Sequence, residues 1–94
     1  MNKAEAKSLI SKELDNYRAK TYQELVSMVD SEPITYEAAG SDGKMYQIEI
    51  QAFGDDKPNG NVRVLGNIDD KGWRSFIPLS DDFIKGPSGE FIGE

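Results

Sequence analysis

The spacing of apolar residues changes at Pro33, and this change constrains the fold more than any other feature of the sequence. Before Pro33, apolar residues recur at the helical spacing of three and four positions. After it they alternate with polar residues, most clearly over 46–52, as in a strand with one buried face. The sequence therefore predicts an α+β fold in which two N-terminal helices pack on one face of an antiparallel sheet.

Two helices are expected before Pro33. The first spans residues 4–18 and carries an apolar stripe made of Ala6, Leu9, Ile10, Leu14 and Tyr17. Thr21 and Glu24 have the spacing of a capping box, which predicts that the second helix starts near Tyr22. Pro33 cannot continue that helix, because its ring disfavours helical backbone before it and removes a donor.

Four strands are expected after Pro33, at 34–39, 46–52, 62–68 and 73–79. Segments rich in Gly, Asp and Asn separate them, which predicts a four-stranded antiparallel meander. One register places apolar residues on the same face of every strand; it pairs Gly40 with Lys44, Phe53 with Asn61, and Ile68 with Trp73. A short C-terminal hairpin is expected around residues 86–89.

The helices are expected to cover the apolar face, with Trp73 in the core. In this register Leu65 and Phe76 lie side by side at the centre of the opposite, outer face. Polar and charged residues surround the pair and complete the expected partner surface: Gln47, Glu49, Gln51, Arg63 and Arg74. Aromatic and Arg side chains are enriched at interface centres. Two other arrangements stay open, in which the tail folds over this face or a second copy pairs with it.

The chain of 94 residues is expected to form a single domain, 1–94, with a helical part at 1–30 and a β part with the hairpin at 33–94. It contains no Cys and no His, which excludes disulfides, thiolate nucleophiles and Cys/His metal sites. The side chain best suited to proton transfer near pH 7 is also missing. We therefore expect a protein that is not an enzyme and that needs no cofactor.

All of the net charge of −6 lies in residues 31–94, because acidic and basic groups balance over 1–30. This excess argues against a nucleic-acid partner, whose phosphates are bound by basic groups, and it permits a basic protein partner. No apolar run approaches the length needed to span a membrane, and the N-terminus has no signal-peptide pattern. A cytoplasmic monomer or homodimer is expected, and the missing Cys agrees with this location.

Pairs of Asp residues in the expected turns offer an alternative. Asp55-Asp56 would meet Asp81-Asp82 at one end of the sheet, and Asp42 would meet Asp69-Asp70 at the other. Such carboxylates could bind Ca²⁺ or Mg²⁺. The segment from Asp55 fails as a calcium loop, since Lys57 and Gly66 occupy ligand positions. Asp is also an ordinary turn residue, which is the interpretation we favour, so no metal ligand is assigned.

Two further positions each allow two interpretations. Glu13 lies inside the helical stripe, either as an edge carboxylate in solvent, which is favoured, or as a buried acid with a partner. Gly66 lies within an expected strand and leaves a dip in the apolar face. The dip is either filled by a helix aromatic, Tyr17 or Tyr22, which is favoured, or left open as a small pocket.

The last two thirds of the chain resemble an uncharacterised family of small bacterial proteins. The likeness runs from Tyr46-Gln47-Ile48-Glu49-Ile50 through Gly72-Trp73-Arg74 to Phe91-Ile92-Gly93-Glu94. It implies a free-standing bacterial module without known activity, and it transfers no functional residue.

The sequence thus predicts a protein-binding module, such as an adaptor, an inhibitor or an immunity-type protein whose acidic sheet blocks a basic target. The alternative is a small metal-binding protein or enzyme that uses the Asp-rich loops at the sheet ends.

Overall fold

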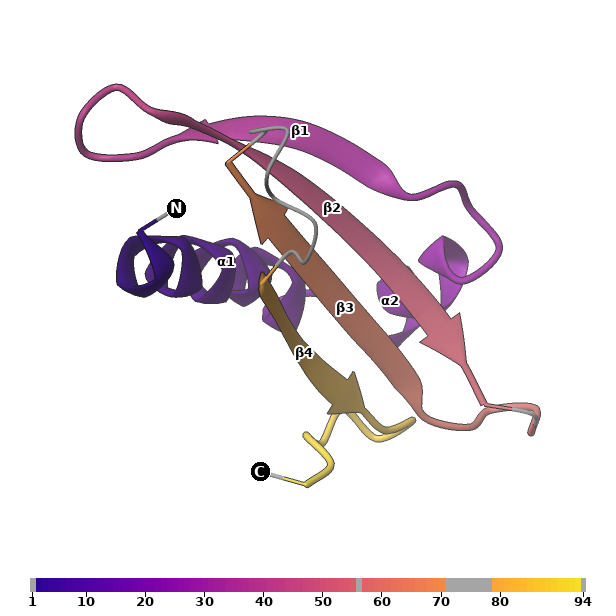
Figure 1. Cartoon of the computed structure of the whole chain (residues 1–94). Helices are drawn as coiled ribbons and strands as arrows, with labels where there is room; N and C mark the ends of the chain where they lie inside the picture. Colours follow the sequence, from indigo (N-terminus) through magenta and orange to yellow (C-terminus); the bar gives the residue numbers. More distant parts are fainter. Residues whose placement is uncertain (1, 56, 71–78, 94) are drawn as a thin grey trace.

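The computed structural model describes residues 2–55, 57–70 and 79–93. Two helices precede four strands: α1 (Lys3–Arg18), α2 (Tyr22–Met28), β1 (Ile34–Ala39), β2 (Met45–Gly54), β3 (Val62–Asp69) and β4 (Leu79–Lys85). The strands form one antiparallel sheet in the order β1-β2-β3-β4 (Figure 1). Because both helices pack against this sheet, the predicted α+β fold is confirmed.

Helix α1 buries the apolar stripe that the sequence predicts. Its first turn is capped by Asn2, whose side chain accepts a hydrogen bond from the Glu5 amide at 3.0 Å. The fully or nearly fully buried residues are Ala6, Ile10, Leu14 and Tyr17, and Leu9 is partly buried beside them. They pack over β3 and β4, so α1 covers the half of the sheet that ends at β4.

Helix α2 begins with the predicted capping box. The Thr21 hydroxyl accepts from the Glu24 amide at 3.1 Å, and the Glu24 carboxylate accepts from the Thr21 amide at 2.9 Å. Tyr22 and Leu25 are buried against β2 and β3. The Tyr22 hydroxyl also donates to the Gly60 carbonyl at 2.6 Å, which attaches α2 to the loop between those strands.

The register between β1 and β2 is the predicted one. Ala38 lies opposite Tyr46, and Ile34 opposite Ile50. Tyr46, Ile48 and Ile50 are fully buried, whereas the residues between them face outward and keep some exposure. The alternation in the sequence therefore predicted correctly which face of β2 packs under the helices.

The predicted register between β2 and β3 is wrong by two residues. Ile48 lies opposite Ile68 instead of Gly66, so the hairpin continues until the Asp55 amide donates to the Asn61 carbonyl at 3.2 Å. The Asp55 carboxylate holds this tight loop together, since it accepts from the amides of Lys57 and Asn61. A shift of two residues leaves every side chain on its predicted face, which is why the apolar pattern did not detect it.

The fourth strand is also displaced from its predicted position. Leu79–Lys85 pairs with β3, and Leu79 rather than Trp73 lies opposite Ile68. Asp81 and Asp82, which were predicted to be turn residues, therefore lie in the middle of a strand. The predicted strand at 73–79 falls mostly on residues 71–78, including Trp73, which lie outside the described residues.

The tail forms the expected hairpin and pairs with the outer edge of β4. Gly86 and Glu90 close its turn, Lys85 bridges to Phe91, and the Ile92 amide donates to the Ile84 carbonyl at 2.8 Å. Phe83 is buried in the core and meets the ring of Phe91 edge to face. The hairpin therefore extends the sheet at its β4 edge, and its described part does not fold over the outer face.

Lys85 anchors this edge to the helical layer. Its side chain is only 7% exposed, and its ammonium donates to the carbonyls of Arg18 at 2.8 Å and Lys20 at 2.6 Å. The Arg18 carbonyl is one of the acceptors that the end of α1 leaves without helical partners, and the Lys20 carbonyl lies just beyond the helix. The same ammonium lies 5.0 Å from the centre of the Phe91 ring.

Candidate functional site

The candidate site is the outer face of the sheet, on the side away from the helices. The register places five of the seven predicted partner-surface residues together on it: Gln47, Glu49, Gln51, Arg63 and Leu65. Arg74 and Phe76 lie outside the described residues. Leu65 stands opposite Gln51 and Asp82, so the predicted cross-strand pairing of Leu65 with Phe76 is wrong.

An apolar band crosses one end of this face. Phe53 lies opposite Arg63, Arg63 lies opposite Ile84, and Ile92 follows Ile84 at the edge of the sheet. Phe53 is 44% exposed and Ile92 37%, whereas Ile84 and Leu65 are half-buried. We call Phe53, Leu65, Ile84 and Ile92 the apolar band. It lies next to the predicted surface and shares only Leu65 with it.

Sequence reasoning missed three of these four residues because it misplaced the strand ends. Phe53 continues the outward-facing series Gln47, Glu49 and Gln51, a signal that was present in the sequence. Ile84 was assigned to the tail because Asp81 and Asp82 look like turn residues. Ile92 reaches the outer face through the pairing of the tail with β4, which no sequence pattern specified.

The apolar band has an ion pair at its centre. The Arg63 side chain donates to the Asp82 carboxylate at 2.7 Å, and both side chains are partly exposed. On the opposite face, Arg18 approaches Asp81 at 4.0 Å. The two neighbouring carboxylates of β4 therefore point to opposite faces, each towards an Arg, which explains how an Asp-Asp pair is accommodated inside a strand.

Beside Phe53, Arg63 and Ile84 the surface is hollowed. These three residues line a shallow depression of about 290 Å³ together with Gly54, Asp55 and Asn61. Its walls combine the Phe53 ring and the Ile84 side chain with the polar residues Asp55, Asn61 and Arg63. Such walls can receive an apolar side chain from another molecule.

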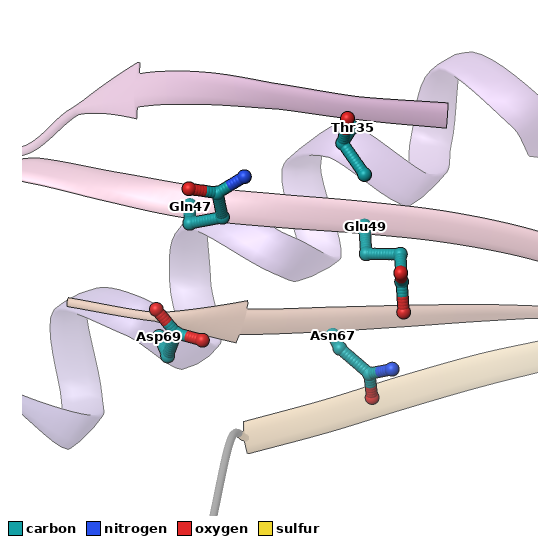
Figure 2. Close-up of a pocket in the computed structure, with 5 residues that line it drawn as sticks. All are labelled: Thr35, Gln47, Glu49, Asn67 and Asp69. Atoms are coloured by element: carbon teal, nitrogen blue, oxygen red, sulfur yellow. The ribbon is translucent and has the colours of Figure 1, made fainter. Parts of the chain in front are cut away.

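A second, polar hollow of about 170 Å³ lies further along the outer face. It is lined by Thr35, Gln47, Glu49, Asn67 and Asp69. These residues belong to β1, β2 and β3, and Figure 2 shows their side chains with helical ribbon behind the sheet. The lining therefore offers two carboxylates together with amide and hydroxyl groups.

The pocket considered at Gly66 does not exist in the described structure. A Cβ atom added to Gly66 would lie 2.8 Å from Cδ1 of Ile10 and 3.3 Å from Cδ1 of Ile50. The dip is thus filled by a residue of α1, as the favoured interpretation required, but by Ile10 rather than Tyr17 or Tyr22.

Glu13 has the partner that the less favoured interpretation supposed. Its carboxylate accepts a hydrogen bond from the Tyr36 hydroxyl at 2.7 Å, and its side chain is half-buried. Burial, followed by the hydrogen bond to Glu13, raises the pKa of the Tyr36 phenol far above its usual value of 10. The phenol therefore stays protonated and joins α1 to β1.

The carboxylate of Glu5 fastens the β1–β2 turn to α1. It accepts from the Ser41 amide at 2.9 Å, from the Ser41 hydroxyl and from the Tyr46 hydroxyl at 2.8 Å. The Ser41 hydrogen bonds, followed by that of Tyr46, lower the pKa of Glu5. Ser41 and Lys44 have the Ser-x-x-Lys spacing of some nucleophilic sites. Here Lys44 lies 3.8 Å from Asp70, so both residues have structural partners.

At the β2–β3 loop end of the sheet, Asp55, Asp81 and Asp82 do not come together as the alternative hypothesis required. Asp81 and Asp82 lie within β4, and the Asp55 carboxylate is bound to backbone amides of its own loop. Among residues 2–55, 57–70 and 79–93, no group of three or more acidic side chains is placed to hold a metal ion.

Comparison with known proteins gives no match: no family model fits the chain, and no curated protein or solved structure matches it. The resemblance to small bacterial proteins stays a prediction. In the described part of the chain, neither helix is long and apolar enough to span a membrane.

Proposed function

We propose that the protein is a non-enzymatic protein-binding module that contacts its partner through the outer face of the sheet. The apolar band, in which Phe53 and Ile92 are exposed, is the observation that carries this proposal. Phe53, Ile84 and Ile92 form a continuous row with Arg63 across the end of the sheet. Scattered exposed apolar residues are ordinary, but a contiguous group with an aromatic residue and an arginine has the composition of an interface centre.

The rigidity of this surface supports the same function. Its residues lie on paired strands, except Ile92 in the tail, and the opposite face of β2 and β3 is buried under the helices. A surface fixed in this way loses little conformational entropy when a partner binds. Binding to such a face would suit an adaptor, or an inhibitor that covers a site on its partner.

Capture of the partner tests the proposal. Immobilised wild-type protein and the double variant Phe53→Ser/Leu65→Ser are exposed to lysate of the native host. The variant should remain folded, because Phe53 is exposed and Leu65 is half-buried, and it should lose proteins that the wild type retains.

Val26→Ser is the matched control, since Val26 is 39% exposed on α2 and does not belong to the outer face. It should retain the same proteins as the wild type. Equal capture by all three proteins would refute the proposed surface. A change in the elution volume of the double variant on size exclusion would instead assign the face to a homodimer.

A further inference from the structure

The two hollows of the outer face differ in chemistry, and their arrangement specifies a class of partner, provided that this face is the binding surface proposed above. The apolar hollow lies beside Phe53 and the polar hollow includes Glu49. Both residues belong to β2 and point to the same side of the sheet. A partner lying along β2 would therefore contact both hollows.

The apolar hollow has little net charge to offer. Its two charged residues already have partners: Arg63 donates to Asp82 at 2.7 Å, and the Asp55 carboxylate accepts from the amides of Lys57 and Asn61. A partner charge placed here would have to compete with that ion pair. An aromatic or large aliphatic side chain instead adds contact with Phe53 and Ile84 and removes apolar surface from water.

The polar hollow favours a cation. Within the described part of the chain, no hydrogen bond or ion pair is made to the carboxylate of Glu49, which lines this hollow. The Gln47 side-chain oxygen is a further acceptor, whereas that of Asn67 already accepts a hydrogen bond from the Ser80 hydroxyl. The net charge of −6 attracts a cationic partner at longer range and repels both a phosphate backbone and a second copy of this chain.

The strand fixes the distance between the two contacts. Glu49 and Phe53 are four residues apart on β2, which corresponds to about 13 Å at the rise of an extended chain. We propose that the partner presents an extended segment with a Lys or Arg four positions away from an aromatic or large aliphatic residue. The basic side chain contacts Glu49, and the apolar side chain enters the hollow beside Phe53.

Synthetic peptides test both the charge and the spacing. The first probe has the order Lys-Thr-Ser-Thr-Phe, with both ends blocked to remove terminal charges. The second has the same composition in the order Thr-Ser-Thr-Lys-Phe, which places the basic group next to the ring. The third replaces Lys by Glu. Titration into isotopically labelled protein, followed by amide chemical shifts, measures affinity and locates the contact.

The first peptide should shift the amides around Glu49, Phe53 and Arg63, and should bind at least about threefold more tightly than either other peptide, as expected for one exposed charge pair. Glu49→Gln should weaken the first peptide about threefold. Asp30→Asn removes the same charge just after α2 and should leave its affinity unchanged.

Three results would overturn the inference: equal affinity for all three peptides, an unchanged affinity in Glu49→Gln, or no binding of the first peptide. Concentration-dependent shifts of the same amides without peptide would overturn it as well, because the face would then bind a second copy. If the peptides fail while capture of the native partner still depends on Phe53, only the charge and spacing are refuted. If that dependence is also absent, the proposed function fails too.

Discussion

A single methyl group added at Gly66 measures how tightly α1 packs on the sheet. In Gly66→Ala the new Cβ would lie 2.8 Å from Cδ1 and 3.1 Å from Cγ1 of Ile10, well inside the usual carbon–carbon contact of about 3.5–4.0 Å. Ile10 and Ile50 are both fully buried, so neither side chain can turn into solvent. Overpacking of this kind costs about 1–3 kcal/mol.

Part of this cost is offset in the unfolded state. Replacing Gly by Ala restricts the unfolded chain and contributes about 0.4–1 kcal/mol of stability where the backbone permits it. We therefore expect Gly66→Ala to lower the free energy of unfolding by about 1–2 kcal/mol. The measurement is urea denaturation followed by far-ultraviolet circular dichroism.

Three further variants test whether contact with Ile10 causes this loss. Gly54→Ala is the matched control, because its Cβ would meet Val29 at an ordinary 3.6 Å, and its stability should not fall. Ile10→Val removes the atom that clashes, so the loss in the double variant Gly66→Ala/Ile10→Val should be smaller than the sum of the single losses. Strict additivity, or a stabilising Gly66→Ala, would show that Ile10 does not fill the dip.

Three other perturbations address the contacts that hold the layers together. Thr21→Ala should lower the free energy of unfolding in urea by about 0.5–2 kcal/mol, because the Glu24 amide loses its acceptor; an unchanged midpoint would argue against the cap. The Ser41 hydrogen bonds lower the pKa of Glu5 below its usual 4.5, so its stabilisation is complete above that pH and is lost as the pH falls through the lower folded-state value. The urea midpoints of wild type and Glu5→Gln should thus differ at neutral pH and converge in acid, and a gap that persists in acid would contradict this. Lys85→Met keeps the alkyl stem but leaves the carbonyls of Arg18 and Lys20 without their charged donor, which should cost about 1–3 kcal/mol and lower the thermal midpoint by several degrees; an unchanged midpoint would count against the anchoring role.

The sequence predicted those parts of the fold that depend on local chemistry. The period of the α1 stripe, the capping box at Thr21 and the alternation along β2 each reflect contacts within a short segment. The β1–β2 register also followed, because the short turn between Gly40 and Lys44 leaves little freedom in the pairing.

Predictions that depended on distant partners failed. The two-residue shift between β2 and β3 comes from the Asp55 carboxylate and from Tyr22 of α2, neither of which alters the alternation of side chains. The position of β4 depends on Arg63 and Arg18, which form ion pairs with Asp82 and Asp81 in the middle of the strand. Without these partners an Asp-Asp pair indicates a turn.

The candidate site was predicted only in part, because some of its residues are brought together by distant partners. Gln47, Glu49 and Gln51 follow from the alternation in β2 alone, and they lie on the outer face as expected. Ile84 and Ile92 join that face only because β4 and the tail pair at its edge, which is a tertiary contact. Patterns within short sequence segments therefore identified the face but not its apolar end.

Site-specific photo-crosslinking tests the central claim most directly. A benzophenone side chain is introduced at Phe53 and Ile92, which belong to the outer face, and at Val26, which has similar exposure but lies on α2. Irradiation in the native host should yield the same crosslinked partner from Phe53 and Ile92 and none from Val26. Crosslinking from Val26 without any from Phe53 and Ile92 would contradict the assignment of the outer face as the binding surface.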